Sequence, residues 1–89
     1  MTRWNLILSG RVQGVGLRYR AKYAAQQFQV TGWIRNLNNG DVELELQGEQ
    51  YNIDSLLEYL HRLPGIRYTI LQAEEIELSE ESRFWIKST

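Results

Sequence analysis

The stretch that decides the fold is Gly10–Arg18, which reads GRVQGVGLR and joins two different periodicities. Before it, Trp4, Leu6 and Leu8 alternate at period two up to Val12, as expected for a strand with one buried face. After it, apolar residues recur at the spacing of a helix. The glycines therefore mark the place where a strand turns directly into a helix.

The same stretch suggests an anion-binding cradle. Glycine lets successive backbone N–H groups converge without a side chain between them, and such a nest at a helix N-terminus carries partial positive charge. Arg18 falls in the first helical turn, where a cation opposes the helix dipole unless an anion joins it. Glycine spacing alone is equally compatible with a flexible turn, so both interpretations stay open at this point.

Composition narrows the class of protein. The 89 residues predict one domain over 1–89, and a hydrophobic content of 43% supports a folded core. Ten Lys plus Arg against eleven Asp plus Glu give a net charge of -1, without the basic excess of a nucleic-acid-binding protein. The absence of cysteine excludes disulfides, thiol nucleophiles and thiolate metal ligands.

The first residues do not predict a membrane segment. The apolar run after Met1 reaches Ser9 and Gly10 too soon for the core of a signal peptide or for a membrane span. We therefore expect a cytoplasmic protein that does not contact a membrane.

Two helices follow from the apolar spacing. The first begins near Leu17 and the second ends at Pro64-Gly65, with Asn52 as its expected N-cap. The apolar stripe of the first helix is Leu17, Ala21, Ala24, Ala25 and Phe28, and that of the second is Ile53, Leu56, Leu57 and Leu60.

The remaining segments read as strands. A strand over 30–36 and an alternating strand through Val42, Leu44 and Leu46 flank Asn39-Gly40, a strong hairpin signal because both residues tolerate positive φ. A later strand is expected over 73–78, with a bulge or register change at 72–74. A turn over 79–82 then leads to a short strand over 84–86.

This order of elements is the split βαβ pattern of an α+β fold. It predicts a ferredoxin-like sandwich, with two helices on one face of an antiparallel sheet of four to five strands. The strands that end at helix starts lie centrally in such a sheet, so the glycine turn opens at one of its edges. Asn36 reaches the same edge only if its strand lies near the start of the first helix, and by itself it reads equally well as a turn residue.

Gly10–Arg18, followed by Gly32–Asn36 (GWIRN), resembles the two signatures of the acylphosphatase family. The similarity covers nearly the whole chain, and two motifs at this spacing are far more specific than a glycine-rich loop. The resemblance implies a small, monomeric, ferredoxin-like hydrolase. Such an enzyme cleaves a small-molecule acyl phosphate to a carboxylate and inorganic phosphate, with no metal and no other cofactor.

The resemblance also implies roles for individual residues. Arg18 matches the arginine that binds phosphate, and Asn36 matches the asparagine that orients the attacking water. The backbone N–H groups of the cradle would come from Gln13, Gly14, Val15, Gly16 and Leu17. Leu17 stands where the family usually has phenylalanine, and residues 68–75 align poorly with the family pattern.

Other candidate residues favour ordinary structural roles. His61 is the only histidine and lies off the apolar stripe of its helix, which indicates a solvated side chain rather than a catalyst or metal ligand. Tyr19, Tyr23 and Trp33 favour packing over base stacking. An acidic set is expected to be a solvated strand face and turn: Glu74, Glu75, Glu77, Glu80 and Glu81.

Two alternative functions share this fold. A nucleic-acid or small-ligand binding module is one, but the strand through 42–46 is acidic and lacks the aromatic motif of an RNA-recognition domain. A regulatory relative without turnover is the other, and the presence of Arg18 and Asn36 argues against it. A phosphate loop of nucleotide-binding proteins is unsupported, since no Gly-Lys-Ser/Thr follows the glycines.

Overall fold

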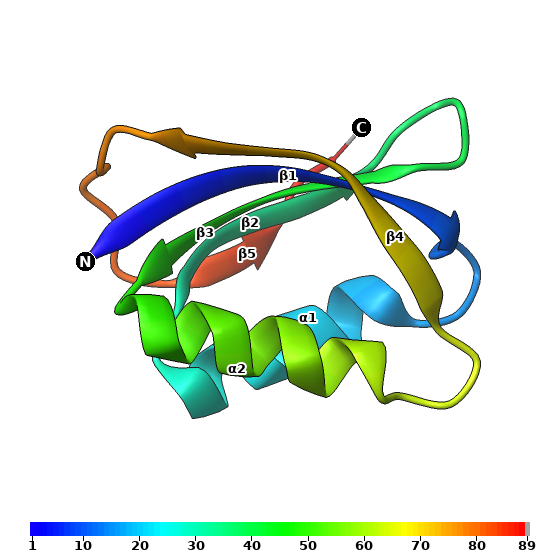
Figure 1. Ribbon diagram of the computed structural model, residues 1–89, viewed down its shortest axis with the longest axis horizontal. Coiled ribbons are helices and arrows are strands. Elements are labelled where there is room, and N and C mark those ends of the chain that lie inside the picture. The colour runs from blue at the N-terminus through cyan, green and yellow to red at the C-terminus, as the bar shows by residue number, and fades with distance from the viewer. Residues whose placement is uncertain (89) are drawn as a thin grey trace.

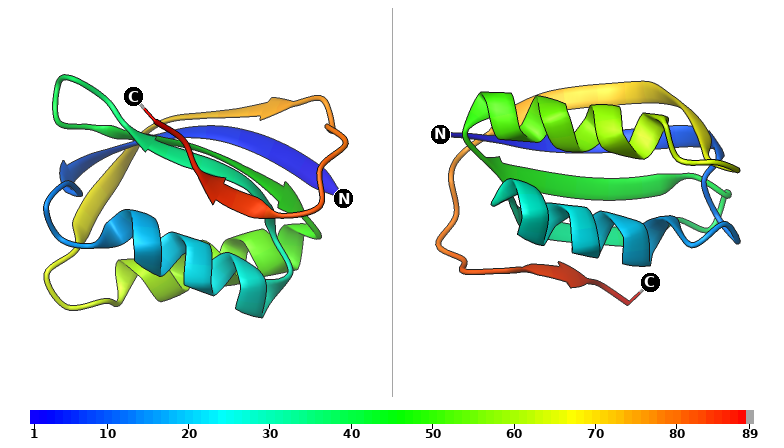
Figure 2. Two further views of the ribbon diagram at one scale, coloured as in Figure 1. Left: turned by 180° about the vertical axis from the view of Figure 1, so that it is seen from behind. Right: turned by 90° about the horizontal axis from the view of Figure 1, so that it is seen from below.

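The computed structural model describes residues 1–88 and shows two helices packed against one face of a twisted sheet (Figures 1 and 2). The elements in chain order are β1 Thr2–Arg11, α1 Leu17–Phe28, β2 Thr31–Asn36, β3 Val42–Gly48, α2 Gln50–His61, β4 Arg67–Ile76 and β5 Phe84–Ile86.

The sheet has the order β4-β1-β3-β2-β5, with β1 and β3 at its centre. The strands β4, β1, β3 and β2 are paired antiparallel, which confirms the ferredoxin-like fold. The fifth strand differs from the prediction, because β5 pairs parallel to β2 and makes the sheet mixed. A three-residue apolar strand carries no sequence signal for its direction, which is fixed by the path of the preceding loop.

The core lies between the sheet and the helices. Leu44 and Leu46 of β3 are completely buried there, as is Leu8 of β1, so the period-two residues of the central strands face the helices. The predicted helical stripes meet them from the other side. The buried stripe residues are Leu17, Ala21, Ala24, Ala25, Ile53, Leu56 and Leu60, with Phe28 and Leu57 partly buried beside them.

The hairpin between β2 and β3 has a loop of five residues. The Leu37 N–H donates to the Asp41 carbonyl at 2.9 Å, and the Gly40 N–H donates to the Leu37 carbonyl at 3.2 Å. Gly40 has a φ of 96°, but Asn39 does not adopt a positive φ, so only half of the expected Asn-Gly turn is realised. The Asn39 side chain instead accepts a hydrogen bond from the Asp41 N–H.

Two predicted boundaries are wrong. α2 begins at Gln50 rather than after Asn52, because the Glu49 carbonyl already accepts hydrogen bonds from the N–H groups of Asn52 and Ile53. β4 begins at Arg67 and ends at Ile76 rather than spanning 73–78. Its alternation is broken by a register shift at Leu71, one residue before the predicted irregularity.

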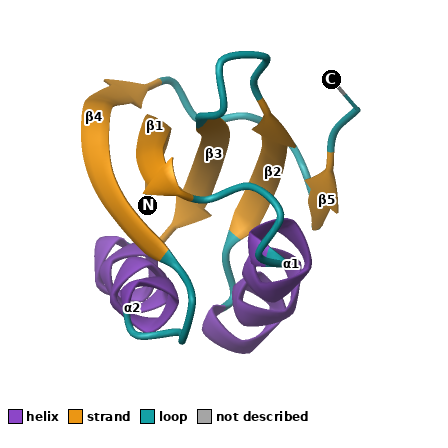
Figure 3. Ribbon diagram, turned by 90° about the vertical axis from the view of Figure 1, so that its right-hand side faces the viewer, coloured by secondary structure: helices purple, strands orange, loops and turns teal. Residues whose placement is uncertain are grey.

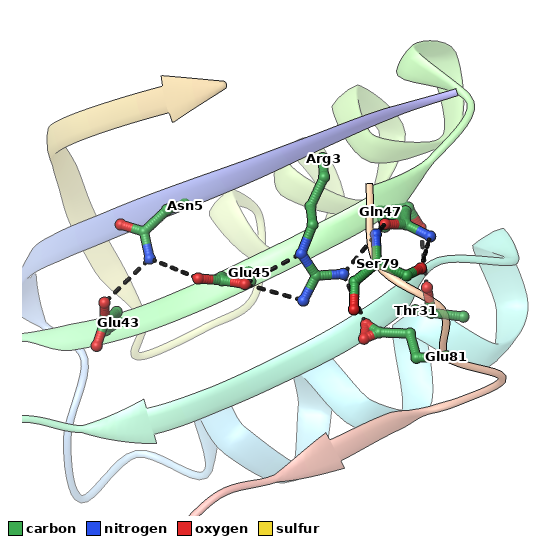
Figure 4. A network of polar contacts seen from close by, with 8 residues as sticks. All are labelled: Arg3, Asn5, Thr31, Glu43, Glu45, Gln47, Ser79 and Glu81. Atoms are coloured by element: carbon green, nitrogen blue, oxygen red, sulfur yellow. Dashed lines mark hydrogen bonds and ion pairs between the residues drawn. The ribbon is translucent and has the colours of Figure 1, made fainter. Parts of the chain in front are cut away.

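The segment from Glu77 to Arg83, here called the strap, connects the outer strands β4 and β5. It passes over the face of the sheet that the helices leave uncovered (Figure 4). There the Ser79 N–H donates to Gln47 Oε1, and Gln47 Nε2 donates to the Ser79 carbonyl, both at 2.8 Å. The predicted solvated acidic set therefore fails for Glu81, which is partly buried and bonded to Arg3 at 2.8 Å.

Arg3 organises a polar network beneath the strap. Its side chain is only 5% exposed, and its guanidinium also donates to Glu45 at 2.9 Å and to Gln47 at 3.2 Å. Burial lowers the pKa of Arg3, but the hydrogen bonds to Glu81 and Glu45 outweigh that effect and raise it. Figure 4 shows that Asn5 extends the network by joining Glu45 to Glu43.

Candidate active site

The predicted site residues come from elements that meet at the end of the sheet opposite the strap (Figure 1), the end that faces the viewer in Figure 3. β1 ends there at Arg11, and β2 ends there at Asn36, which pairs with Val42 at the start of β3. The connection from β1 to α1 and the β2–β3 hairpin are therefore neighbours. The antiparallel order of the sheet brings two motifs together although they are separated along the chain.

The connection over 12–16, here called the cradle loop, owes its shape to glycine. Gly14 and Gly16 have φ values of 73° and 78°, a region that other residues rarely adopt. A side chain at either position would meet open space, so their requirement is conformational rather than steric. Val15 between them packs against the core and anchors the loop.

The N-terminus of α1 has no side-chain cap. Gly16 is its N-cap and provides no side-chain hydrogen bond, and the first turn contains no acidic residue. The first helical hydrogen bond runs from the Arg20 N–H to the Gly16 carbonyl at 3.1 Å. The N–H groups before Arg20 therefore have no intrahelical partner and carry the positive end of the helix dipole.

Arg18 lies in this first turn and is partly buried. It forms no ion pair with any residue between 1 and 88, whereas Arg3, Arg35 and Arg62 are each bonded to a glutamate. Leu17 beside it is fully buried in the core. This position, where the family pattern usually has phenylalanine, is therefore a packing position here. The arrangement leaves a guanidinium available next to unpaired N–H groups.

Asn36 provides an unpaired acceptor at the same end. Its Oδ1 atom is buried and has no hydrogen-bond partner, the only such side-chain atom in the part of the chain that the structure describes. Asn36 lies two positions after the fully buried Ile34, so both side chains face the helices. A buried polar atom without a partner costs about 1–3 kcal/mol, which makes this position a candidate for a functional role.

The side chain of Gln13 connects the two parts of the site, and the sequence did not predict this. Its Nε2 donates to the carbonyls of Leu37 and Asp41, each at 2.8 Å. The cradle loop is thereby bonded to the hairpin that follows Asn36. Sequence spacing carried no signal for these contacts, because the partners are 24 and 28 positions away and accept through their backbone.

The weaker candidates take structural positions. His61 is exposed, with its ring 5.1 Å from that of Tyr68, as the surface interpretation predicts. Burial, with a smaller effect from Glu58, raises the pKa of Tyr68 to about 12, and its hydroxyl donates to the Leu57 carbonyl at 2.6 Å. Trp33 does not pack into the core but lies under Lys87 Nζ, which is 4.5 Å from its ring centroid.

Tyr19 and Tyr23 are exposed on α1, 70% and 57% respectively, which excludes them from the core. Over residues 1–88, no group of three or more histidine, aspartate or glutamate side chains is arranged to hold a metal ion. Neither described helix combines the length and apolar character needed to cross a membrane.

Comparisons with known proteins give one consistent result. A family model described as Acylphosphatase matches residues 4–86. A protein named Acylphosphatase from Clostridium beijerinckii is 44% identical over 65 residues, or 73% of this chain and 72% of the relative. One of the same name from Methanospirillum hungatei is 35% identical over 81 residues, or 91% of this chain and 86% of the relative.

The solved structures agree with the sequences. The structure of an acylphosphatase from Coxiella burnetii superposes with a TM-score of 0.86 at 37% identity, covering 97% of this chain and 92% of that one. The likeness therefore extends over nearly the whole chain.

Proposed function

This chain belongs to the acylphosphatase family and is an acylphosphatase, and we propose that Arg18, the cradle loop and Asn36 carry out its hydrolysis of acyl phosphates. The main observation behind this assignment is the buried Oδ1 of Asn36, unpaired within residues 1–88, at the same end of the sheet as the first N–H groups of α1, which have no intrahelical partner. Both features leave polar groups available to a ligand where proteins normally satisfy them.

The cradle and Arg18 bind the phosphoryl group in this proposal. The backbone N–H groups of Gln13, Gly14, Val15, Gly16 and Leu17 donate to its oxygens, and the Arg18 guanidinium neutralises charge with its fork of donors. These groups are fixed before the substrate arrives. They therefore stabilise the charge that develops as the bond to the carboxylate breaks.

Asn36 holds the attacking water in line with the scissile bond. Its Oδ1 accepts a hydrogen bond from the water and leaves a lone pair of the water oxygen directed at phosphorus. As the new P–O bond forms, the bond between phosphorus and the carboxylate oxygen breaks, and the carboxylate leaves with the electron pair. A phosphate oxygen of the substrate takes one proton of the water, and the other remains on the product phosphate.

No protein general base is needed in this mechanism. An acyl phosphate is an activated anhydride, and its carboxylate leaves without protonation. The rate enhancement then comes from positioning and charge stabilisation, which fits phosphoryl transfer generally. We propose that the reaction requires neither metal nor other cofactor.

Hydrolysis of benzoyl phosphate tests these roles. Arg18→Ala and Asn36→Ala are each expected to lower kcat/KM about a hundredfold or more, as removal of a positioned donor or acceptor does in other enzymes. Inorganic phosphate should compete with substrate in the wild type and in Asn36→Ala but only weakly in Arg18→Ala. Arg20→Ala and Asn38→Ala, which alter exposed neighbours of the same residue types, serve as matched controls.

Three results would contradict the proposal. Near wild-type turnover in Arg18→Ala or Asn36→Ala would show that the substituted residue does not have its assigned role. Failure of phosphate to compete with substrate would show that the cradle loop does not bind the phosphoryl group. Loss of activity on addition of a chelator would exclude the metal-free mechanism.

We further propose that residues 1–89 act as one monomeric, cytoplasmic domain that uses neither nucleic acid nor a membrane. One hydrophobic core cluster links β1, β2, β3 and β5 to both helices, which supports a single unit. Light scattering of the purified chain, and its activity with and without added RNA or lipid vesicles, tests these properties.

A further inference from the structure

We infer that the side chain of Gln13 is a positioning residue that sets Asn36 at a fixed distance from the cradle loop. This inference rests on the proposed function, because it concerns how the two parts of that site are held together. It goes further in assigning the side chain of Gln13 a task separate from that of its backbone N–H group.

The geometry is that of a two-point clamp. One amide nitrogen, Gln13 Nε2, lies 2.8 Å from the carbonyl oxygens of both Leu37 and Asp41. These carbonyls belong to the first and last residues of the hairpin loop, and each already accepts a backbone hydrogen bond inside that loop. Gln13 therefore binds the loop where it is closed, which fixes the loop as a unit.

The position of the clamp in the chain makes it effective. Leu37 directly follows Asn36, so holding the Leu37 carbonyl restrains the backbone that carries the Asn36 amide. At its other end, Gln13 directly precedes Gly14, the first residue of the cradle loop with a positive φ. The two halves of the site are thus joined by one partly buried side chain.

The chemistry of the clamp favours glutamine. A neutral carboxamide supplies two N–H donors, one for each carbonyl. Ionised glutamate supplies none and would place negative charge beside two carbonyl oxygens, and leucine of similar size supplies none while remaining neutral. Since a displacement of about 1 Å can cost about a hundredfold in rate, loss of the clamp should reduce kcat although no group that touches substrate is removed.

A double-mutant cycle with Asn36 tests the inference. Gln13→Leu alone is expected to lower kcat for benzoyl phosphate about tenfold or more, while the inhibition constant of inorganic phosphate changes less than about threefold. In the Asn36→Ala background, Gln13→Leu should have little further effect on kcat, because the clamp acts through Asn36. Gln27→Leu, the same replacement at an exposed position on α1, should match the wild type in every measurement.

Gln13→Glu adds a readout that loss of folding would not reproduce. When protonated, glutamic acid has one O–H donor and can restore one of the two hydrogen bonds. The ratio of its kcat to that of the wild type should therefore rise as the pH falls toward about 4.3, whereas that of Gln13→Leu should stay flat.

Two results would overturn the inference and assign Gln13 to the cradle alone. One is that the effects of Gln13→Leu and Asn36→Ala on kcat are additive. The other is that Gln13→Leu weakens phosphate binding by the same factor as it lowers kcat. An NMR measurement tests the clamp independently of the proposed function. In Gln13→Leu, amide hydrogen exchange over residues 37–41 should accelerate and the Asn36 side-chain signals should shift, whether or not the wild type hydrolyses benzoyl phosphate. Unchanged exchange and unchanged signals would exclude the clamp itself.

Discussion

At the strap end of the sheet, the buried guanidinium of Arg3 is bonded to Glu45, Glu81 and Gln47, whereas at the cradle end Arg18 and Asn36 Oδ1 have no such partners within residues 1–88. Both ends place polar side chains in buried or partly buried positions. At the first end these groups satisfy one another. At the second they remain available, although an unpaired buried group opposes folding.

The difference distinguishes polar groups that stabilise the fold, around Arg3, from polar groups that are available to a ligand, at Arg18 and Asn36. A charged network that is satisfied internally fixes the path of the strap but offers little to a ligand. A set of unsatisfied groups held by a clamp and by glycine geometry lowers stability and preorganises a binding site. Substitutions of the polar side chains at the two ends should therefore have opposite consequences for stability and activity.

The largest expected effect is on the network. Arg3→Ala leaves the carboxylates of Glu45 and Glu81 without their partner, and breaking a buried ion pair in this way costs about 3–5 kcal/mol. Urea unfolding measures this loss. Activity per folded molecule should stay within about twofold of the wild type, with Arg20→Ala as the surface control. A loss of kcat in folded Arg3→Ala would show that the Arg3 network contributes to activity as well as to stability.

A smaller effect is expected at the cradle glycine. Gly16→Ala forces a Cβ into the left-handed region and should cost about 1–2 kcal/mol. Gly65→Ala provides a matched control, because Gly65 has a φ of 83° and open space around it but lies outside the cradle loop. Both variants should lose similar stability in urea, and only Gly16→Ala should bind phosphate more weakly. Equal phosphate affinity in the two would show that the cradle does not bind the anion.

The third prediction concerns the unpaired acceptor. Asn36→Leu removes a buried polar atom that has no hydrogen-bond partner among the described residues and should raise the free energy of unfolding by about 1 kcal/mol. It should also lower kcat/KM about a hundredfold or more, as expected for Asn36→Ala. A stabilised, inactive variant would sharpen the contrast with Arg3→Ala, while destabilisation would show that Asn36 is a structural residue.

The smallest effect is a pH dependence at the network. Burial raises the pKa of Glu43, but hydrogen bonds from Asn5 and Arg35 outweigh it and lower the pKa below its usual value of 4.5. Glu43 therefore binds a proton more readily in the unfolded chain, so its contribution is present above pH 4.5 and is lost as the pH falls through its lower folded value. Glu43→Gln should flatten the decline of unfolding free energy over this range, and an unchanged slope would contradict the assignment.

Local patterns predicted the elements that position the site. The change of period around the glycines placed the strand, the cradle loop and α1, because each depends on residues only a few positions apart. The candidate residues Arg18 and Asn36 came from two short motifs. The structure places these motifs at the same end of the sheet, while the roles of the residues remain predictions.

Long-range contacts and irregular edges were not accessible in the same way. The Arg3–Glu81 pair joins residues 78 positions apart, and nothing in the acidic run distinguishes Glu81 from its solvated neighbours. β4 was placed too late because its residues are mostly exposed on both faces and Leu71 interrupts its alternation. The clamp by Gln13 depends on backbone carbonyls, which no side-chain pattern encodes.

The parallel pairing of β5 with β2 has a consequence for association between copies of the chain. Without β5, the backbone of β2 from Gly32 to Ile34 would present unpaired groups at a sheet edge, the usual template for aggregation. β5 covers that edge, and the Lys87 N–H extends the cover by donating to the Ile34 carbonyl at 2.8 Å. The strap that the Arg3 network holds in place thus delivers a protective strand to the same element that ends in Asn36.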